Sequence, residues 1–321
     1  MNNANNNTYG RAYEYACLMQ LADLVAVTHP VEILKDSHFI ATERSWNEVD
    51  DVLRDTLTRS GKAAAETILT LERMIVADGD DSTVLSIQSD QAGGEGDVRD
   101  ILIRRKDRSW EVGLSIKHNN FAVKHSRLAK TLDFGDKWFG VKCSQEYWDE
   151  ICPIFAYLDE EHHKKTEWKH LPNKEMDIYV PLLKAFLSEL ERAYGYDQAI
   201  PQKLVEYLLG RYDFYKVISL DSEHLTRIQP VNLHGTLNKP DGINKPTLVI
   251  PVSALPTRII AAGMRPGSSN TAELFLDKGW QFSFRIHNAS TVVEPSLKFD
   301  IKFEGLPVTI ISINTPWEEN V

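Results

Sequence analysis

The sequence predicts an α/β protein in which a mixed sheet is flanked by helices and followed by a helical insertion and a β-rich C-terminal part. Three observations support this fold class. Apolar residues recur at helical spacing near the N-terminus and again over about residues 146–210. Alternating polar and apolar residues over 97–117 indicate an antiparallel hairpin. Short β-branched and aromatic runs, separated by Gly, Pro and Asn, follow Asp213.

Three helices and a strand are expected before the hairpin. The first helix covers the segment RAYEYACLMQLADLVA, residues 11–26. The second runs from Ser45 to about Ser60 and the third, rich in Ala, Leu and Glu, from Lys62 to about Val76. A strand in STVLSIQSD, residues 82–90, and a Gly-rich turn in QAGGEGD, residues 91–97, then follow. The buried stripe of the first helix would contain Tyr13, Ala16, Cys17 and Leu21.

The periodicity changes twice along the chain, so we expect three parts. Residues 1–145 would form the core that carries the chemistry. Residues 146–212 would form a helical segment, with strong helical periodicity in YVPLLKAFLSELERAY and IPQKLVEYLLGRY. Residues 213–321 would form the β-rich part, which we expect to recognise a partner.

The composition is that of a globular protein, with 42% hydrophobic and 26% charged residues. No apolar run approaches the ~18 to 20 residues of a membrane helix. The N-terminal MNNANNNTYG lacks the basic and apolar parts of a secretory signal, so a cytoplasmic location is expected. Cys17, Cys143 and Cys152 form no Cys-x-x-Cys unit and are expected to be buried free thiols.

A basic window stands out in this acidic chain. The formal net charge is -10, which argues against a polyanionic partner. Between Arg99 and Lys142, however, eleven basic and five acidic residues give a local balance of +6. A binding face for a polyanion has this kind of asymmetry, although a solvated basic stretch is the alternative.

The hydrophobic pattern of the hairpin selects one register. If the polar KDRS stretch, residues 106–109, is the turn, Asp100 faces Ser115 and lies diagonally to Lys117. Strand side chains alternate between faces, so the opposite face then receives only aliphatic residues. A slip by one residue would bury charge and expose these aliphatic side chains. They are Ile101, Ile103, Val112, Leu114 and Ile116.

The pair Asp100 and Lys117 suits hydrolysis of a phosphate ester. Mg²⁺ favours one or two carboxylates with water and phosphate oxygens, and the carbonyl of Ile116 is a further ligand. Such a metal activates water and neutralises developing charge, while a lysine positions or deprotonates the nucleophile. The alternative is a surface salt bridge worth ~0 to 1 kcal/mol. Asp97 is a second candidate ligand, ranked behind Asp100.

This arrangement resembles the core of the PD-(D/E)xK nucleases, in which an Asp on one strand and an acid-x-Lys on the next bind the metal. Asp100 and Lys117 match the pattern, whereas Ser115 stands in place of the acid. More specifically, the chain resembles type II restriction endonucleases of the HaeIII kind. The likeness covers most of the chain and is carried by GRAYEYACL, GDVRDILI, GLSIKHNNFAVKHSRL and SFRIHNASTVVEPSLKFDI.

The resemblance implies a PD-(D/E)xK-like mixed sheet, with residues 1–145 as nuclease core and 213–321 as the DNA-recognition part. It also implies Mg²⁺ as cofactor and double-stranded DNA as substrate, cut within a short palindrome for which GGCC is the candidate. Glu14 resembles the helix Glu that such nucleases aim at the metal. Glu72 and Glu66 are alternative donors, and a plain surface role for Glu14 stays open.

Two partners besides DNA follow from the same resemblance. A homodimer suits a palindromic target, although a monomer that acts twice would leave the same sequence traces. A cognate DNA methyltransferase is the expected functional partner of a restriction endonuclease.

A donor-rich run after Lys117 could contact DNA. Asn pairs with adenine and Arg or Lys with guanine in the major groove, and the same side chains bind phosphates. A solvated loop is the alternative, and a zinc site built on two histidines lacks a third ligand of suitable spacing. The run consists of His118, Asn119, Asn120, Lys124, His125 and Arg127, and further candidates in the C-terminal part are Arg285, His287 and Asn288.

Three functions are weighed. A metal-dependent DNA endonuclease accounts for Asp100, Lys117 and the basic window together. Ser115 in place of an acid leaves room for a DNA-binding protein that kept the nuclease scaffold and lost cleavage. The net charge of -10 would suit a protein-interaction module, which does not account for the basic window.

Overall fold

The structure is a computed structural model that describes residues 3–89, 96–239, 246 and 248–317. Most of the predicted Gly-rich turn lies outside these residues. The chain forms two compact units, each described here by itself. Unit 1 comprises Met1–Phe121, Gly210–Ser253 and Val308–Val321, and unit 2 comprises Ala122–Leu209 and Ala254–Pro307.

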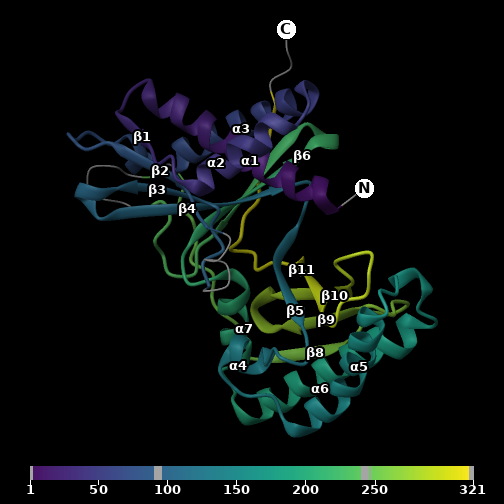
Figure 1. Ribbon diagram of the computed structural model, residues 1–321. Coiled ribbons are helices and arrows are strands. Elements are labelled where there is room, and N and C mark those ends of the chain that lie inside the picture. The colour runs from purple at the N-terminus through teal and green to yellow at the C-terminus, as the bar shows by residue number, and fades with distance from the viewer. Residues whose placement is uncertain (1–2, 90–95, 240–245, 247, 318–321) are drawn as a thin grey trace. The chain divides into compact units, whose positions relative to one another are not determined.

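Unit 1 is built on a seven-stranded mixed sheet, against which three helices lie (Figure 1). The helices are α1 (Asn3–Ala26), α2 (Ser37–Glu48) and α3 (Asp51–Leu71). The strands, in sheet order, are β1 (Val31–Ile33), β2 (Thr83–Ile87), β3 (Ile101–Arg105), β4 (Trp110–His118), β6 (Phe214–Leu220), β7 (Leu225–Val231) and β12 (Ile313–Pro316). The β1/β2 and β4/β6 pairs are parallel, and the other neighbours are antiparallel.

The predicted hairpin and its register are confirmed. In the β3/β4 pair, Leu102 faces Gly113 and Arg104 faces Glu111. A short 3-10 turn, Lys106–Arg108, joins the strands, and Ser109 closes it in the left-handed conformation at φ 49°. All five predicted aliphatic residues are buried in the core of the unit, none more than 4% exposed. The alternation of the two strands therefore determines which side chains face away from that core.

The first predicted helix is confirmed, and its predicted stripe is buried at 0 to 3% exposure. The predicted break between the second and third helices, near residue 61, is wrong. The break falls at Val49–Asp50, where the Asp50 carboxylate caps α3 by accepting from the backbone N–H of Leu53. Gly61 lies inside α3 and does not end a helix. A glycine is needed there because α1 packs closely: a Cβ would come within 3.1 Å of the backbone of Ala16.

A buried polar chain fixes α1 and α3 onto the sheet. The Tyr13 hydroxyl lies 2.7 Å from the Ser60 hydroxyl, which lies 2.8 Å from that of Thr226 on β7. Thr226 also donates to the Ser60 carbonyl. Because buried hydroxyls cost stability unless they are paired, this chain holds the rotation of α1 about its own axis.

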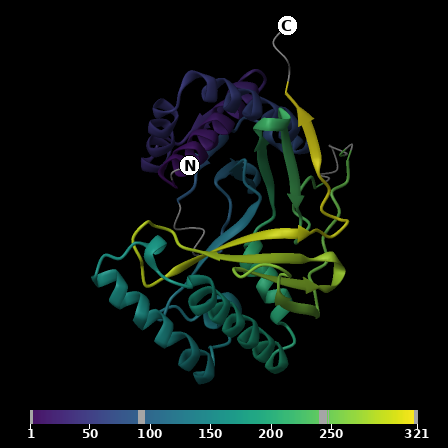
Figure 2. The ribbon, with the colours of Figure 1, turned by 90° about the vertical axis from the view of Figure 1, so that its right-hand side faces the viewer.

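Unit 2 is a five-stranded antiparallel sheet with helices packed against it (Figure 2). In sheet order the strands are β5 (Ala122–Leu128), β11 (Leu297–Gly305), β10 (Gln281–His287), β9 (Thr271–Leu276) and β8 (Ile259–Met264). The helices are α4 (Phe134–Phe139), α5 (Gln145–His163), α6 (Val180–Tyr196) and α7 (Ile200–Leu209).

Aromatic side chains form much of the core of unit 2. Phe186 of α6 is fully buried, and its ring centroid lies 5.1 to 5.2 Å from those of Phe134, Phe284 and Phe299. Trp138 of α4 joins them at 5.6 Å. Helices and sheet of this unit therefore share one hydrophobic core, with offset and edge-on ring contacts.

The predicted division at residues 145 and 212 differs from the borders of the two units. The helical segment and the β-rich C-terminal part are both present, but β6, β7 and β12 complete the large sheet of unit 1. Strand β5, from the predicted core, belongs instead to the second sheet. Strands pair across long sequence separations, which local periodicity does not reveal.

Two expectations from composition can be compared with the structure. All three cysteines are free thiols, as expected, but only Cys17 is buried. The expected burial is wrong for Cys143, which is half-buried, and for Cys152, which is exposed on α5. Within the described residues, no helix combines the length and the apolar character that a membrane crossing requires.

Phe186→Ala should destabilise the protein, because the substitution opens a cavity among four aromatic rings. We expect a loss of roughly 3 to 5 kcal/mol in the free energy of unfolding, measured by urea titration. Tyr196→Ala, on the same helix but at a side chain that is 82% exposed, is the matched control. Equal stability of the two variants would contradict the role of Phe186.

Candidate active site

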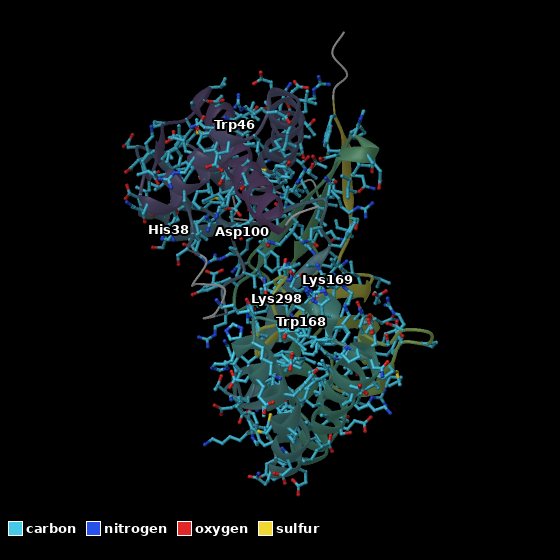
Figure 3. All side chains as sticks on the ribbon, turned by 45° about the vertical axis from the view of Figure 1, so that its right-hand side comes forward. His38, Trp46, Asp100, Trp168, Lys169 and Lys298 are labelled. Carbon is cyan, nitrogen blue, oxygen red and sulfur yellow. The ribbon has the colours of Figure 1, made fainter. Side chains whose placement is uncertain are left out.

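The centre of the site is the Asp100 carboxylate at the start of β3, labelled in Figure 3. Its Oδ2 accepts from the backbone N–H of Ile116 at 2.6 Å and from Lys117 Nζ at 3.2 Å, with Ser115 Oγ at 3.4 Å. Oδ1 takes part in none of these contacts. About a quarter of each side chain of the ion pair is exposed, so the pair is open to solvent on one side.

Asp97, the second candidate ligand, is used to hold Arg99. Its two oxygens accept from Arg99 Nε at 2.8 Å and from a terminal nitrogen at 2.7 Å, a bidentate pair. Arg99 also donates to Glu111 at 2.8 Å and lies 4.0 Å from the ring centre of Tyr212. Burial alone would raise the pKa of Asp97, but the hydrogen bonds and charge of Arg99 lower it. The geometry therefore favours Asp100 over Asp97.

Gly113 makes room for this arginine. A Cβ at Gly113 would come within 2.1 Å of the Arg99 side chain, which crosses β4 at that residue. Gly113 pairs with Leu102 and lies on the same face of the hairpin as Ser115. The Arg99 side chain therefore covers β4 two residues before Ser115. The close approach of Arg99 thus explains why the interior of β4 contains glycine, a residue of low β-propensity.

Glu14 lies on α1, which packs against β4. Burial is the main cause that raises the pKa of the Cys17 thiol, and the negative charges of Glu14 and Asp100 also raise it, against a hydrogen bond from Tyr13. Both carboxylates therefore lie close enough to act on the same buried thiol.

The alternative helix donors have other roles. Glu72 is 2% exposed, and its Oε1 accepts from the Tyr215 hydroxyl at 2.6 Å and from the Asn238 N–H at 2.7 Å. Burial raises the pKa of Glu72 to about 7, in spite of these two hydrogen bonds. Glu66 lies on the exposed side of α3, 3.8 Å from Lys62. Neither shows a link to Asp100.

His118 and Asn119 are tied to Asp221, a residue that we did not single out from the sequence. His118 Nε2 lies 2.6 Å from Asp221 Oδ2, and Asn119 Nδ2 donates to the same oxygen at 2.9 Å. The rings of Tyr9 and Tyr13 lie 6.1 and 6.2 Å from that of His118. Burial alone would raise the pKa of Asp221, but hydrogen bonds from these partners and Ser219 lower it.

Lys216 is a second residue that the sequence did not indicate. The parallel register of β4 and β6 pairs it with Ser115, so both side chains lie on the face of Asp100. The lysine is 3% exposed, and its Nζ donates to the Phe121 carbonyl at 2.9 Å. Local sequence patterns do not indicate this neighbour, because Ser115 and Lys216 meet only through the pairing of β4 with β6.

Three further residues of the predicted DNA-binding run lie in unit 2, on β5. Lys124 Nζ donates to the Tyr207 carbonyl at 2.8 Å and lies 3.9 Å from the centre of the Tyr207 ring. His125 and Arg127 point to the other face of the sheet and are exposed, at 54% and 42% of the side chain. Asn120 lies in unit 1, separated from this strand by Phe121.

The three C-terminal candidates lie at the end of β10. Arg285 is half exposed and donates to Asp300 Oδ2 at 3.1 Å. Burial lowers the pKa of His287, and the charge of Arg285 lowers it further, against a hydrogen bond to the Asn288 carbonyl. Asn288 Nδ2 donates to the Ser290 carbonyl, and its Oδ1 accepts from the Tyr179 hydroxyl at 3.4 Å.

One arginine of the basic window is not available for the binding face that we expected from its charge. Arg105 is fully buried, where it binds Asp81 and the carbonyls of Met74 and Ala77. The window also divides between the two units at residue 121. Counting charges along the sequence cannot show that an arginine supports the interior.

The site can supply oxygen ligands to a cation. Asp100 and Glu14 are carboxylates, and the Ile116 carbonyl belongs to the strand next to Asp100. In the part of the chain that the structure describes, no three His, Cys, Asp or Glu side chains converge as a metal-binding group. Such a donor set suits a hard cation that keeps water and substrate oxygens as its other ligands.

The whole sequence was compared with known proteins. The profile of the HaeIII restriction endonuclease family matches residues 10–307. A curated relative, the Type II restriction enzyme HaeIII from Haemophilus aegyptius, is 51% identical over 320 residues, which cover 99% of this chain and 100% of that protein. No solved structure matches the chain.

Lys124 should lose its proton at an unusually low pH. Burial lowers the pKa of Lys124 to about 8, and the charge of Lys137 contributes. Between about pH 8 and ~10.4, the unfolded chain binds more protons here than the folded chain, so stability should rise with pH in that window. The pKa would be measured by NMR of ¹³Cε-labelled lysine, with the signal assigned through Lys124→Met.

The predicted dependence of stability on pH has a matched control. Unfolding would be followed against pH for the wild type, Lys124→Met and Lys169→Met, the last at a lysine that is 68% exposed. Only Lys124→Met should remove the rise. A titration of Lys124 above pH ~10, as in model peptides, would contradict the burial argument.

Proposed function

Because the chain belongs to the HaeIII restriction endonuclease family, we propose that Asp100 and Lys117 form the centre of its active site, which hydrolyses double-stranded DNA with Mg²⁺. The 51% identity over nearly the whole chain makes the protein a site-specific restriction endonuclease, that is, a deoxyribonuclease. The observation that carries the catalytic assignment is the carboxylate–lysine pair, 3.2 Å apart at an open end of the β3–β4 hairpin.

We assign the metal to Asp100, Glu14 and the Ile116 carbonyl. The fit rests on the Asp100 side chain, whose Oδ2 is fixed by two donors while Oδ1 is left for a ligand. Mg²⁺ takes one or two carboxylates and keeps several waters, which agrees with this small donor set. When bound, the cation would supply an activated water and neutralise charge on the phosphate.

The residues of the chain then divide the remaining work. The Ile116 N–H and Lys117 hold the Asp100 carboxylate in one orientation. The Lys117 ammonium positions the attacking water and stabilises the extra negative charge of the phosphorane-like transition state. Water attacks the phosphorus, one P–O ester bond breaks, and the leaving oxygen takes up a proton.

The PD-(D/E)xK assignment of the fold is part of this proposal. It is supported by Asp100, which immediately precedes β3, and by Lys117 on the neighbouring antiparallel strand β4, because these correspond to the Asp and Lys of that pattern. Ser115 departs from it, and its hydroxyl lies beside Asp100 where a second carboxylate would be expected. Glu14 replaces that missing charge from α1.

For the substrate, we propose contacts on both units. His118, Asn119 and Asn120 follow the catalytic strand in unit 1, where they could bind the DNA backbone near the cut. In unit 2 the proposed contacts are Lys124, His125, Arg127, Arg285, His287 and Asn288. Lys124 is the weakest of them, because its ammonium is already engaged by Tyr207.

The target is proposed to be a short palindrome, with GGCC as the candidate. A two-fold dimer would present the same residues to each half of such a site. A cognate DNA methyltransferase would protect the same sequence in the host. These three points rest on the family and not on a contact in the structure.

Lys117→Ala and Asp100→Asn should each abolish most of the cleavage, because they remove charge that acts at the phosphate. We expect a fall of roughly 10² to 10³-fold in the single-turnover rate on phage DNA with Mg²⁺. Ser115→Ala, on the same strand and face, is the matched control, with a loss of at most about tenfold. Sequencing the fragment ends of the wild type would give the recognition site.

Folding and DNA binding of each variant would be checked by circular dichroism and gel shift. Full activity of Lys117→Ala would refute the catalytic assignment. A wild type that binds its DNA but leaves it intact with Mg²⁺ would instead favour a DNA-binding protein on a nuclease scaffold, the reading suggested by Ser115.

Glu14→Gln should weaken metal binding, because one of two proposed carboxylate ligands loses its charge. The Mg²⁺ concentration for half-maximal cleavage should rise by roughly tenfold or more, and calorimetry of Mg²⁺ binding to the protein–DNA complex should show the same shift. Asp23→Asn, at an exposed carboxylate of the same helix, is the control. An unchanged metal midpoint would leave Glu14 with a surface role.

A further inference from the structure

We propose that one half of the polar face of the five-stranded sheet reads the DNA sequence, with Arg285 as a base-contacting residue and Asp300 as the residue that positions it. This reading face consists of side chains from β5, β11 and β10. The inference rests on the proposed function, because it takes duplex DNA as the ligand. The residues that it adds to the proposed contacts are Lys298, Asp300 and Lys302.

The strand registers bring these side chains together. Alternate residues of β11 lie on one face, so Lys298, Asp300 and Lys302 point the same way. Across the ladder, Asp300 pairs with His125 of β5 on one side and with Arg285 of β10 on the other. The neighbouring pairs are Lys298 with Arg127 and with His287, and Lys302 with Ser283. Figure 3 labels Lys298 on this strand.

The reading face is positively charged within an acidic protein. It carries four cationic side chains against three carboxylates. These are Asp300 and Glu304 of β11 and Glu294, which precedes β11 and lies 3.5 Å from Arg127. The β9–β8 half of the same sheet face differs, because Arg265 there is bound by Glu273 at 2.6 Å and Glu304 at 2.5 Å. The four cations of the reading face are Arg127, Arg285, Lys298 and Lys302.

Asp300 is the unusual member of the face. Its side chain is only 8% exposed, and Oδ1 is buried without a hydrogen bond, with His125 Nδ1 3.9 Å away. Oδ2 accepts from Arg285 at 3.1 Å and lies 3.6 Å from Lys302 Nζ. A buried carboxylate with an unsatisfied oxygen reduces stability, so its presence is better explained by the cations that it orients.

Arg285 has the geometry of a base-reading side chain. Its side chain is 50% exposed, and its hydrogen bond to Asp300 uses one terminal nitrogen of the guanidinium. A guanidinium fork matches the O6 and N7 of guanine in the major groove, which admits an antiparallel β-ribbon. Lys298 and Arg127, paired across β11 and the edge strand β5, are placed to hold the DNA backbone.

The test compares binding to two duplexes, one with the site mapped from the cleavage fragments and one with that site scrambled. Full-length protein would be titrated by fluorescence anisotropy with Ca²⁺ in place of Mg²⁺. Arg285→Lys keeps the charge beside Asp300 but loses the planar fork. It should weaken binding to the specific duplex about 10- to 100-fold and leave the scrambled duplex unaffected. Arg258→Lys, at an arginine of unit 2 that is 70% exposed, is the matched control.

Cleavage with Mg²⁺ gives a second readout of the same variant. The ratio of cleavage rates at the mapped site and at sites with one base changed should fall in Arg285→Lys. An unchanged ratio, or an equal loss of binding to both duplexes, would overturn the base contact.

Asp300→Asn tests the positioning role. The preference for the specific duplex should fall as in Arg285→Lys, while the melting temperature stays the same or rises, because a buried charge has been removed. A purely structural Asp300 would show the reverse, a lower melting temperature with an unchanged preference. That result would overturn its assignment.

Lys298→Ala tests the backbone contact. The substitution should weaken binding to both duplexes equally and reduce the slope of log K against log salt by ~0.9. An unchanged slope would overturn this contact. The two proposals can fail separately: a protein that reads its site without cleaving would refute the role of Asp100 and Lys117, whereas an active protein with full specificity in Arg285→Lys would refute the reading face.

Discussion

The register of the β3–β4 hairpin is the constraint on which the candidate site depends. Five aliphatic side chains of the two strands enter the core of unit 1, and burial of that set admits only one pairing of the strands. The same pairing leaves Asp100 and Lys117 on the opposite face, 3.2 Å apart. Hydrophobic burial on one side of the sheet thus positions charged chemistry on the other side.

The surrounding carboxylates show why Asp100 is distinctive. Asp97 is neutralised by a bidentate arginine, Asp213 accepts hydrogen bonds from four donors in residues 233–236, and Glu72 is buried against Tyr215. These groups fix loops and strands, because they accept hydrogen bonds or ion pairs from partners inside the protein. Asp100 combines one fixed oxygen with partial exposure, which is what a ligand of a metal ion needs.

In our proposal, the two units divide the work that a site-specific endonuclease requires. The carboxylate–lysine pair belongs to unit 1, whereas the basic half of the five-stranded sheet belongs to unit 2. The chain passes directly from the catalytic strand β4 to β5, with only residues 119–121 between them. The strands with the proposed cutting and reading residues are therefore consecutive in sequence, and Lys216 binds the segment between them through the Phe121 carbonyl.

Much of this protein followed from its sequence, because local patterns have local causes. Alternation determined the hairpin and the pair Asp100 and Lys117, and helical spacing determined the buried stripe of α1. Three further points were decided by tertiary structure. They are the helix break at Asp50, the burial of Arg105, and the pairing of β5 with β11. The reason is that each involves contacts between residues far apart in the chain. Gly61 continues α3 past the predicted break because α1 approaches it closely, and Arg105 is buried because it binds Asp81. Pairing of β5 with β11 and of β11 with β10 brings Asp300 to His125 and Arg285.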